Sequence, residues 1–265
     1  MSHPANHPPS IHILQINQND DHIAAEKTIA FLHRFNSSIS PSDHQLILLI
    51  QEPYYWVHGS PSCPKNYTSF YIHTPASGAS KALKARTLIL CPQSLTPQIV
   101  GHFSTRDTVM VRILFDNRAV LLISRYFPDK QNPANQLKSI DPAIRCDTIL
   151  GGDINLKHPL WGSPSVEQHA LLVEEFALSH SLSCLNHNKN AGPSFQSSRG
   201  SSFIDASFAS YNLCSALSSW EQLPIDALSS DHTAFLFSFQ GSQRPPLLPN
   251  APSIIDLQTK QNTEQ

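Results

Sequence analysis

Glycine is scarce in this chain, with 9 residues among 265, whereas proline occurs 21 times. Charge is sparse as well: Asp, Glu, Lys and Arg make up 14% of the residues, and the formal net charge is −2 with histidine neutral. The composition therefore does not indicate the strongly basic surface that many nucleic-acid-binding proteins carry. The prolines predict stiff connections, and a hydrophobic content of 40% suits a globular protein of one large domain or two small ones.

Paired cysteines and long apolar runs are also missing. The five cysteines are far apart, odd in number and without a C-x-x-C pair: Cys63, Cys91, Cys146, Cys184 and Cys214. This spacing argues against a zinc site or a disulfide framework and fits a reducing compartment. The longest apolar runs, such as 46–50 and 119–123, are far shorter than the roughly 20 residues that span a bilayer. The first ten residues lack the apolar segment of a signal peptide, so we expect no membrane association.

What the chain does contain is a series of short apolar segments that end in polar residues. They predict strands at 11–16, 46–50, 67–73, 87–91, 108–115, 119–124, 148–150, 194–195, 202–204 and 234–239. Asp20 and Asp21 can cap a first helix, and a second helix is expected within 167–180. Many short strands with few helices favour an α/β or α+β sandwich built on β-sheets. We place this domain at 11–240, between a disordered arm at 1–10 and a Pro/Gln-rich tail at 241–265.

The stretch 148–163, TILGGDINLKHPLWGS, carries the strongest chemical signal. A short apolar strand ends there in two glycines, which allow a tight turn and a close approach of the backbone to another group. Asp153 and Asn155 follow, and two positions apart on an extended chain they point the same way. A carboxylate and an amide can then activate and position one water molecule. The alternative is a polar turn in which both residues bond only to the local backbone.

Polar residues of the same kind recur at other predicted strand ends. Asn17, Glu52, Tyr126, Asp153 and Asp205 each follow an apolar strand, whereas Asp231 and His232 precede the last one. If that last strand runs opposite to the others, all of these side chains reach one rim of the sheets. Carboxylates gathered there need a counter-charge, and oxygen ligands favour a hard cation such as Mg²⁺. A metal, a carboxylate base, an imidazole and amide donors suit the hydrolysis of a phosphate ester.

Each of these residues also has a simpler explanation. Glu52 can be a solvated strand end, Asn17 a turn or cap residue, and Tyr126 an aromatic residue at the edge of the core. Asp205 can pair with a nearby arginine such as Arg199, and the sequence around His232 can form an ordinary turn before a strand. It is the joint occurrence in this order that favours a site.

Several segments together resemble the endonuclease/exonuclease/phosphatase superfamily, which includes DNase I and the abasic-site repair endonucleases. The matching segments are ILQINQN at 13–19, QEP at 51–53, SRY at 124–126, GGDIN at 151–155, SFID at 202–205 and SDH at 230–232. Within the superfamily, the likeness is strongest to the endonuclease domain of LINE-type (non-LTR) retrotransposons. That likeness depends on HPLWGS at 158–163, GPSF at 192–195 and RGSS at 199–202. In two places the chain departs from the pattern: Ser194 stands where Thr is usual, and Ala206–Ser207 where Leu–Thr is common.

The resemblance implies a DNase I-like, four-layer α/β sandwich with two packed mixed β-sheets flanked by helices. It also implies an endonuclease that uses Mg²⁺, with Mn²⁺ as a substitute, to nick one strand of double-stranded DNA and leave a 3′-hydroxyl. A reverse transcriptase encoded by the same element is the implied protein partner. A nuclear location follows from the substrate, and a cytoplasmic one is the alternative, because no basic targeting cluster stands out.

The resemblance further implies a role for each matched residue. Glu52 would bind the metal, helped by Asn17 and Asp231. Asp153 would accept the proton of the attacking water, and Asn155 would orient water or phosphate. The remaining roles are contact of His232 with the scissile phosphate, orientation of that ring by Asp205, and a hydrogen bond from Tyr126 to the phosphate.

Substrate contacts and the exact reaction are less constrained. Ser194, Lys157 and Arg199 are expected to bind substrate, the two basic residues because they flank site loops. Two other functions stay open: hydrolysis of small or lipid phosphoesters on the same fold, and a catalytically silent retrotransposon remnant that only binds.

Overall fold

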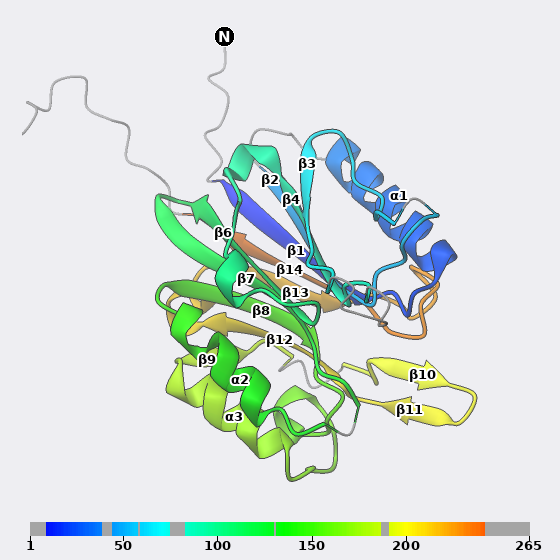
Figure 1. Ribbon diagram of the computed structural model, residues 1–265, viewed down its shortest axis with the longest axis vertical. Coiled ribbons are helices and arrows are strands. Elements are labelled where there is room, and N and C mark those ends of the chain that lie inside the picture. The colour runs from blue at the N-terminus through cyan, green and yellow to red at the C-terminus, as the bar shows by residue number, and fades with distance from the viewer. Residues whose placement is uncertain are drawn as a thin grey trace, which may run out of the picture.

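Two six-stranded β-sheets face each other, with helices on both outer faces (Figure 1). The computed structural model describes residues 9–38, 44–57, 59–74, 83–129, 131–186 and 191–241. The predicted N-terminal arm and C-terminal tail lie, apart from Pro9, Ser10 and Gly241, outside these residues. The layers are α1, the first sheet, the second sheet, and α2 with α3 (Figure 1). The predicted four-layer α/β sandwich is therefore confirmed.

The first sheet contains both the start and the end of the domain. Its strands, in spatial order, are β13 (Leu217–Gln222), β14 (Phe235–Gln240), β1 (Ser10–Asn17), β2 (His44–Gln51), β4 (Thr87–Pro92) and β3 (Tyr67–Phe70). β1 pairs in parallel with β2 and antiparallel with β14. The outer face is covered by α1 (His22–Ser38), and the Asp21 carboxylate caps this helix by accepting the backbone N–H groups of Ile23 and Ala24.

The second sheet is built from the middle of the chain. Its strands, in spatial order, are β5 (Gln98–Ile99), β6 (Thr108–Phe115), β7 (Arg118–Tyr126), β8 (Asp147–Asp153), β12 (Asp205–Ser210) and β9 (Leu182–Cys184). The predicted hairpin between β6 and β7 turns at Asp116 and Asn117, which both have positive φ. The outer face is covered by α2 (Ala134–Ile140) and α3 (Ala170–Ser179), and the short helix α4 (Tyr211–Cys214) follows β12.

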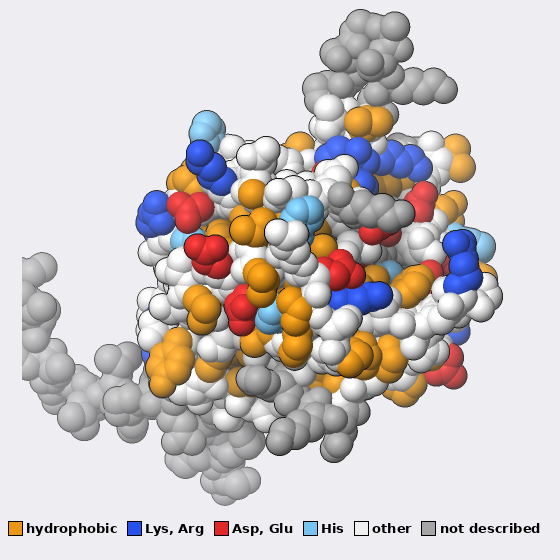
Figure 2. Space-filling model, turned by 90° about the horizontal axis from the view of Figure 1, so that it is seen from below, with side chains coloured by type: hydrophobic (Ala, Val, Ile, Leu, Met, Phe, Trp, Pro, Cys, Tyr) orange, Lys and Arg blue, Asp and Glu red, His pale blue; other side chains and the backbone are white. Residues whose placement is uncertain are grey.

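A separate two-stranded hairpin projects from the body at one end of the second sheet (Figure 1). It consists of β10 (Phe195–Ser197) and β11 (Gly200–Ser202), with Arg199 in its turn. Viewed from the face that α2 and α3 cover, hydrophobic, acidic and basic side chains are mixed (Figure 2). This face therefore has no extended surface of one charge, as the low net charge predicts. None of the helices in the described ranges is long and apolar enough to cross a membrane.

The two sheets approach each other most closely at the glycine pair that follows Leu150. A Cβ atom on Gly151 would lie 2.7 Å from Oε1 of Gln15, and one on Gly152 would lie 2.6 Å from the carbonyl oxygen of Arg125. Neither glycine has a positive φ, and β8 continues through both to Asp153. The expected close approach is therefore confirmed, whereas the expected turn is wrong because the strand continues in extended form.

Candidate active site

Strand direction brings the predicted polar residues to one rim. The parallel pairs β1/β2 and β7/β8 end at that rim, and so they deliver Asn17, Glu52, Tyr126 and Asp153. β12 and β14 are antiparallel to their neighbours and deliver residues from their starts. Asp205 therefore begins its strand, opposite Asp153 in register, rather than following a strand as we expected. The predicted reversal of the last strand is confirmed.

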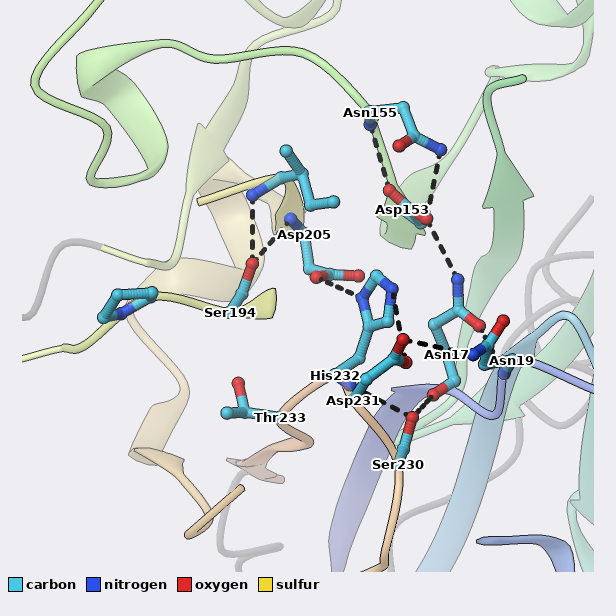
Figure 3. A network of polar contacts seen from close by, with 12 residues as sticks. Asn17, Asn19, Asp153, Asn155, Ser194, Asp205, Ser230, Asp231, His232 and Thr233 are labelled. Atoms are coloured by element: carbon cyan, nitrogen blue, oxygen red, sulfur yellow. Dashed lines mark hydrogen bonds and ion pairs between the residues drawn. The ribbon is translucent and has the colours of Figure 1, made fainter. Parts of the chain in front are cut away.

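His232 and Asp205 form the central pair of the rim (Figure 3). Nδ1 of the imidazole lies 2.8 Å from Oδ2 of Asp205, and the two residues are 5% and 2% exposed. Burial on its own would lower the pKa of His232, but the charge of Asp205 and the hydrogen bond to it, followed by the charges of Asp153 and Asp231, raise it to about 9. The ring therefore carries a proton at neutral pH. The alternative pairing of Asp205 with Arg199 is not needed to explain this aspartate.

Asp153 is held by two amides. Its Oδ2 accepts hydrogen bonds from Nδ2 of Asn17 at 2.9 Å and from Nδ2 of Asn155 at 3.2 Å, and its Oδ1 accepts from the backbone N–H of Asn155 at 3.0 Å (Figure 3). Asn155 has a φ of 51°, which turns its side chain back over the strand end. Burial, and then the neighbouring charge of Asp205, raise the pKa of the Asp153 carboxyl well above its ordinary value. Such a carboxylate accepts a proton more readily than an exposed one.

Glu52 is linked to this group through Asn17. The Asn17 amide donates to Oε2 of Glu52 at 3.2 Å as well as to Asp153, while its own Oδ1 accepts the backbone N–H of Asn19. Glu52 has a φ of 44°, so the chain bends sharply as β2 ends. The backbone carbonyl of Glu52 accepts the N–H of Asp20, which ties the loops after β1 and β2 together.

Tyr126 lies against an arginine at the same rim. The Arg86 guanidinium sits over its ring at 4.7 Å and also forms two hydrogen bonds of 2.6 Å to the carboxylate of Asp107. Burial, and then the charges of Glu52 and Asp153, raise the pKa of the Tyr126 phenol above its ordinary value. The phenol therefore stays protonated and can donate a hydrogen bond.

Asp231 completes the rim on the side of α1. Its Oδ2 accepts from Nδ2 of Asn19 at 3.1 Å, and its Oδ1 is buried without a hydrogen-bond partner among the described residues, 4.0 Å from Nε2 of His232 (Figure 3). Ser230 anchors the segment by donating to the carbonyl of Asn17 and accepting the backbone N–H of His232. An unpartnered carboxylate oxygen that faces an imidazolium marks the place where a ligand would fit.

The three residues predicted to bind substrate lie in different settings. Ser194 is 2% exposed, and its hydroxyl accepts the backbone N–H groups of Ile204 and Asp205 from behind the site. The structure thus gives Ser194 a positioning role, and a direct substrate contact by it stays a prediction. Arg199 is exposed in the turn of the projecting hairpin, and Lys157 is partly exposed on the loop after β8.

The HPLWGS segment is a structural part of that loop. The ring nitrogen Nδ1 of His158 accepts the N–H of Leu160 at the start of a short 3₁₀ helix, Pro159–Trp161. The Trp161 indole is 2% exposed, packs on His158 and donates to the carbonyl of Leu156. This segment fixes the loop that begins at Asn155, so the motif supports the site without reaching into it.

A compact set of possible metal ligands lies at the centre of the rim. One ligand atom from each of Asp153, Asp205 and His232 falls within 4.8 Å of the others. Glu52 and Asp231, which we expected to bind metal, border this group through Asn17 and His232. Oxygen atoms dominate the whole set, which suits a hard divalent cation.

Four residues that hold the site received no role from the sequence. Asn19 bonds Asp231, Arg86 covers Tyr126, and Asn186 donates to the carbonyl of Asp205 at 2.9 Å. Ser230 was part of the SDH match, but its two bonds depend on how β1 and β14 pair. Nothing in the local sequence marks Asn186, because it follows β9, a strand without a clear apolar signal.

Comparison with known proteins gives a consistent result. Residues 120–236 match a protein family described as "Endonuclease-reverse transcriptase". Among solved structures, the endonuclease domain of TRAS1, a telomere-specific non-LTR retrotransposon, is 22% identical, with a TM-score of 0.69 over 88% of this chain and 100% of that one. The AP endonuclease LMAP from Leishmania major is 14% identical, with a TM-score of 0.64 over 88% of this chain and 89% of that one. A search of curated proteins finds no match.

The fold and the rim of carboxylates, amides and one imidazole define an endonuclease/exonuclease/phosphatase protein of the DNase I type. A family protein from Leptotrichia buccalis C-1013-b has the same fold, at a TM-score of 0.57 and 13% identity over 87% of this chain and 99% of that one. Within this class, the chain resembles the endonucleases of LINE-type retrotransposons, as the family match and the TRAS1 structure confirm.

Proposed function

We propose that the protein is a Mg²⁺-dependent endonuclease that nicks one strand of double-stranded DNA. The observation that carries the proposal is the protonated, buried His232–Asp205 pair beside a carboxylate, Asp153, whose pKa is raised. A fixed positive charge and a proton acceptor on one rim are what the hydrolysis of a phosphodiester by water requires.

Asp153 takes the proton of the attacking water. Two hydrogen bonds to its Oδ2 and one to its Oδ1 fix the direction of the carboxylate, and Asn155 is placed to orient the water. The water oxygen forms the new bond to phosphorus while the bond to the 3′ oxygen breaks. The products are then a 5′-phosphate and a 3′-hydroxyl.

His232 and Tyr126 stabilise the charge that develops on the phosphate. The imidazolium presents Nε2, because Nδ1 is occupied by Asp205. The protonated phenol of Tyr126 donates a hydrogen bond from the opposite side of the rim. These groups are in place before the reaction, which is the condition under which electrostatic stabilisation is most effective.

The donor set fits a hard divalent cation. Four carboxylates gather at the rim, and the buried Oδ1 of Asp231 has no hydrogen-bond partner within the described ranges. Glu52 would hold the ion with Asp231 and, after rotation of its amide, Asn17. The bound ion would supply a Lewis acid that polarises a phosphate oxygen. Mg²⁺ suits these oxygen ligands, and Mn²⁺ is the expected substitute.

The proposed partners follow from the same likeness. Double-stranded DNA is the substrate, and a reverse transcriptase encoded by the same element is the protein partner that the family description supports. A nuclear location follows from the substrate. Hydrolysis of small phosphoesters is the second candidate, since the fold itself does not select DNA.

Nicking of a supercoiled plasmid with Mg²⁺ or with EDTA tests the proposal. We expect metal-dependent nicking in the wild type and a loss of at least about 100-fold in Asp153→Asn and His232→Gln. Two matched controls should keep the wild-type rate. Asp147→Asn changes the other end of β8, and His180→Gln breaks a second His–Asp pair, with Asp141, of the same 2.8 Å length.

The outcomes separate the candidates. Wild-type rates in Asp153→Asn and His232→Gln would refute the assigned roles. A folded wild type that nicks no DNA with Mg²⁺ or Mn²⁺ but releases phosphate from small esters would establish the second candidate. Binding of DNA without any hydrolysis would indicate a silent remnant.

Lys157 and Arg199 test the substrate contact. Because both are at least partly exposed on loops that flank the rim, each is proposed to contact a DNA phosphate. Lys157→Ala and Arg199→Ala should each weaken binding by severalfold and reduce the salt dependence of the affinity by about one phosphate contact. Unchanged affinity and salt dependence in both variants would show that the DNA runs elsewhere.

A further inference from the structure

Three aromatic side chains form a shelf on the side of the rim nearest α1. The rings of Tyr54 and Trp56 meet edge to face at 5.2 Å, and the ring of His22 lies 6.0 Å from that of Tyr54. Tyr54 and Trp56 are partly exposed, and His22 is exposed. We refer to these three residues as the aromatic shelf.

The shelf is continuous with the catalytic rim. Tyr54 follows Glu52 by two residues, and its backbone N–H lies 3.4 Å from Oε1 of Gln18, in the segment after Asn17. His22 follows Asp20, whose N–H donates to the carbonyl of Glu52 at 2.8 Å. Both loops that carry the shelf are therefore fixed to the loop of the proposed metal ligand.

The loop that carries Trp56 is held in place by its own contacts. The indole Nε1 donates to Oγ of Ser62 at 2.7 Å, and the backbone of Trp56 bonds to both Gly59 and Ser60. Tyr55 is only 4% exposed and points the other way, into a cluster with Tyr71 and His73. Tyr55 therefore anchors the loop in the protein, which leaves Tyr54 and Trp56 on the outside. A core role explains Tyr55 but not its two neighbours.

Exposed aromatic rings next to a phosphate site suit a nucleobase. Bases that leave the helical stack are bound by stacking on aromatic side chains, a contact that depends little on salt. A chain with a net charge of −2 has few phosphate contacts to offer, so stacking would supply affinity that charge does not. We propose that the aromatic shelf stacks an unpaired base of the DNA strand beside the nicked phosphate. This inference rests on the proposed function and adds its preferred substrate, DNA that is locally unpaired at the rim.

Intrinsic fluorescence gives a direct test. The chain has three tryptophans. Trp161 is 2% exposed under α3, and Nε1 of Trp220 is buried on β13, so the quenching caused by a stacked base should come from Trp56. The wild type in EDTA is titrated with a duplex that contains a single-base bulge and with the same duplex fully paired. The variants are Trp56→Ala, Tyr54→Ala and Trp56→Phe, and Tyr211→Ala, an aromatic residue 73% exposed beyond the far end of β12, is the control.

We expect quenching and about tenfold tighter binding of the bulged duplex by the wild type and by Tyr211→Ala. Trp56→Ala and Tyr54→Ala should bind both duplexes equally while keeping the wild-type salt dependence, and Trp56→Phe should restore the preference. Equal preference for the bulge in wild type and Trp56→Ala would overturn the proposal, and so would a uniform loss of affinity for both duplexes.

Nicking assays on the same proteins keep the two proposals apart. A wild type that prefers the bulge but nicks nothing would contradict the endonuclease and leave the shelf standing. A wild type that nicks normally, with no effect of Trp56→Ala on binding or on the choice of substrate, would contradict the shelf alone.

Discussion

The space between the two sheets has an apolar half and a polar half, and the change occurs along each strand. On β1 the inward side chains are Ile11 and Ile13 far from the rim, then Gln15 and finally Asn17 at the rim. The same progression from apolar to polar to catalytic occurs on β2, β7 and β8, in the series Ile47, Leu49, Gln51; Val120, Leu122, Ser124, Tyr126; and Ile149, Gly151, Asp153.

In the polar half, hydrogen bonds join one sheet to the other. Gln15 donates to the carbonyl of Gly152 at 3.1 Å and accepts the hydroxyl of Ser207 at 2.6 Å. Gln51 donates to Ser124 at 3.0 Å, and Ser124 donates to the carbonyl of Ile50. Apolar contacts stabilise without direction, whereas hydrogen bonds require a defined distance and angle. The comparison therefore indicates that the apolar half supplies stability and that the polar half sets the register of the sheets beneath the catalytic residues.

The largest effect on stability should come from the apolar half. Phe237 is 0% exposed between the sheets. Phe237→Ala should lower the free energy of unfolding by about 3–5 kcal/mol, because it removes buried apolar area and leaves a cavity. Urea denaturation measures the loss. Nicking per folded molecule should stay near the wild-type rate, and a large fall in that rate would break the division between the two halves.

The pH dependence of stability should come from the polar rim. The pKa of His232 rises from 6.5 to about 9 on folding, so the folded state binds this proton more tightly than the unfolded state. The resulting stabilisation is complete below pH 6.5 and is lost as the pH rises through about 9. Between pH 6 and 10 in EDTA, the wild type should lose about 3 kcal/mol more than His232→Gln.

Thermal unfolding of both proteins across this range measures the difference, which should appear as several degrees in Tm, about 2–4 °C for each kcal/mol. Breaking the pair of His180 with Asp141, which forms at the surface, provides the control. If His180→Gln reduced the pH dependence as much as His232→Gln, the rim would not be its source.

The sequence predicts the rim well because strand ends are legible. An apolar run that stops at a polar residue identifies both the strand and the residue that it delivers, as for Asn17 and Glu52. The direction of β14 then places His232 with them. The match to a known family adds roles that no local pattern supplies.

The sequence fails where the sheets approach most closely. β12, with the sequence DASFAS, was not predicted, because small and polar residues fill the narrow space and leave no apolar run. The predicted strand at 148–150 stopped too early for the same reason, since Gly151 and Gly152 have no side chains that could mark it. The edge strand β13 and the short helix α2 are half-exposed or brief, and so their periodicity is weak.

The smallest expected loss of stability, and the most informative, is at Gln15. Gln15→Leu keeps the volume but leaves the carbonyl of Gly152 and the hydroxyl of Ser207 without their partner, which should cost about 1–3 kcal/mol. Because Gly152 directly precedes Asp153, a small shift there should lower nicking by about tenfold to 100-fold, more than in Phe237→Ala. Adding Ser207→Ala should recover part of the stability by removing one unpaired group, but not the nicking, because the carbonyl of Gly152 stays unpaired. If Gln15→Leu and Phe237→Ala lowered nicking per folded molecule equally, the polar layer would be no more than another part of the core.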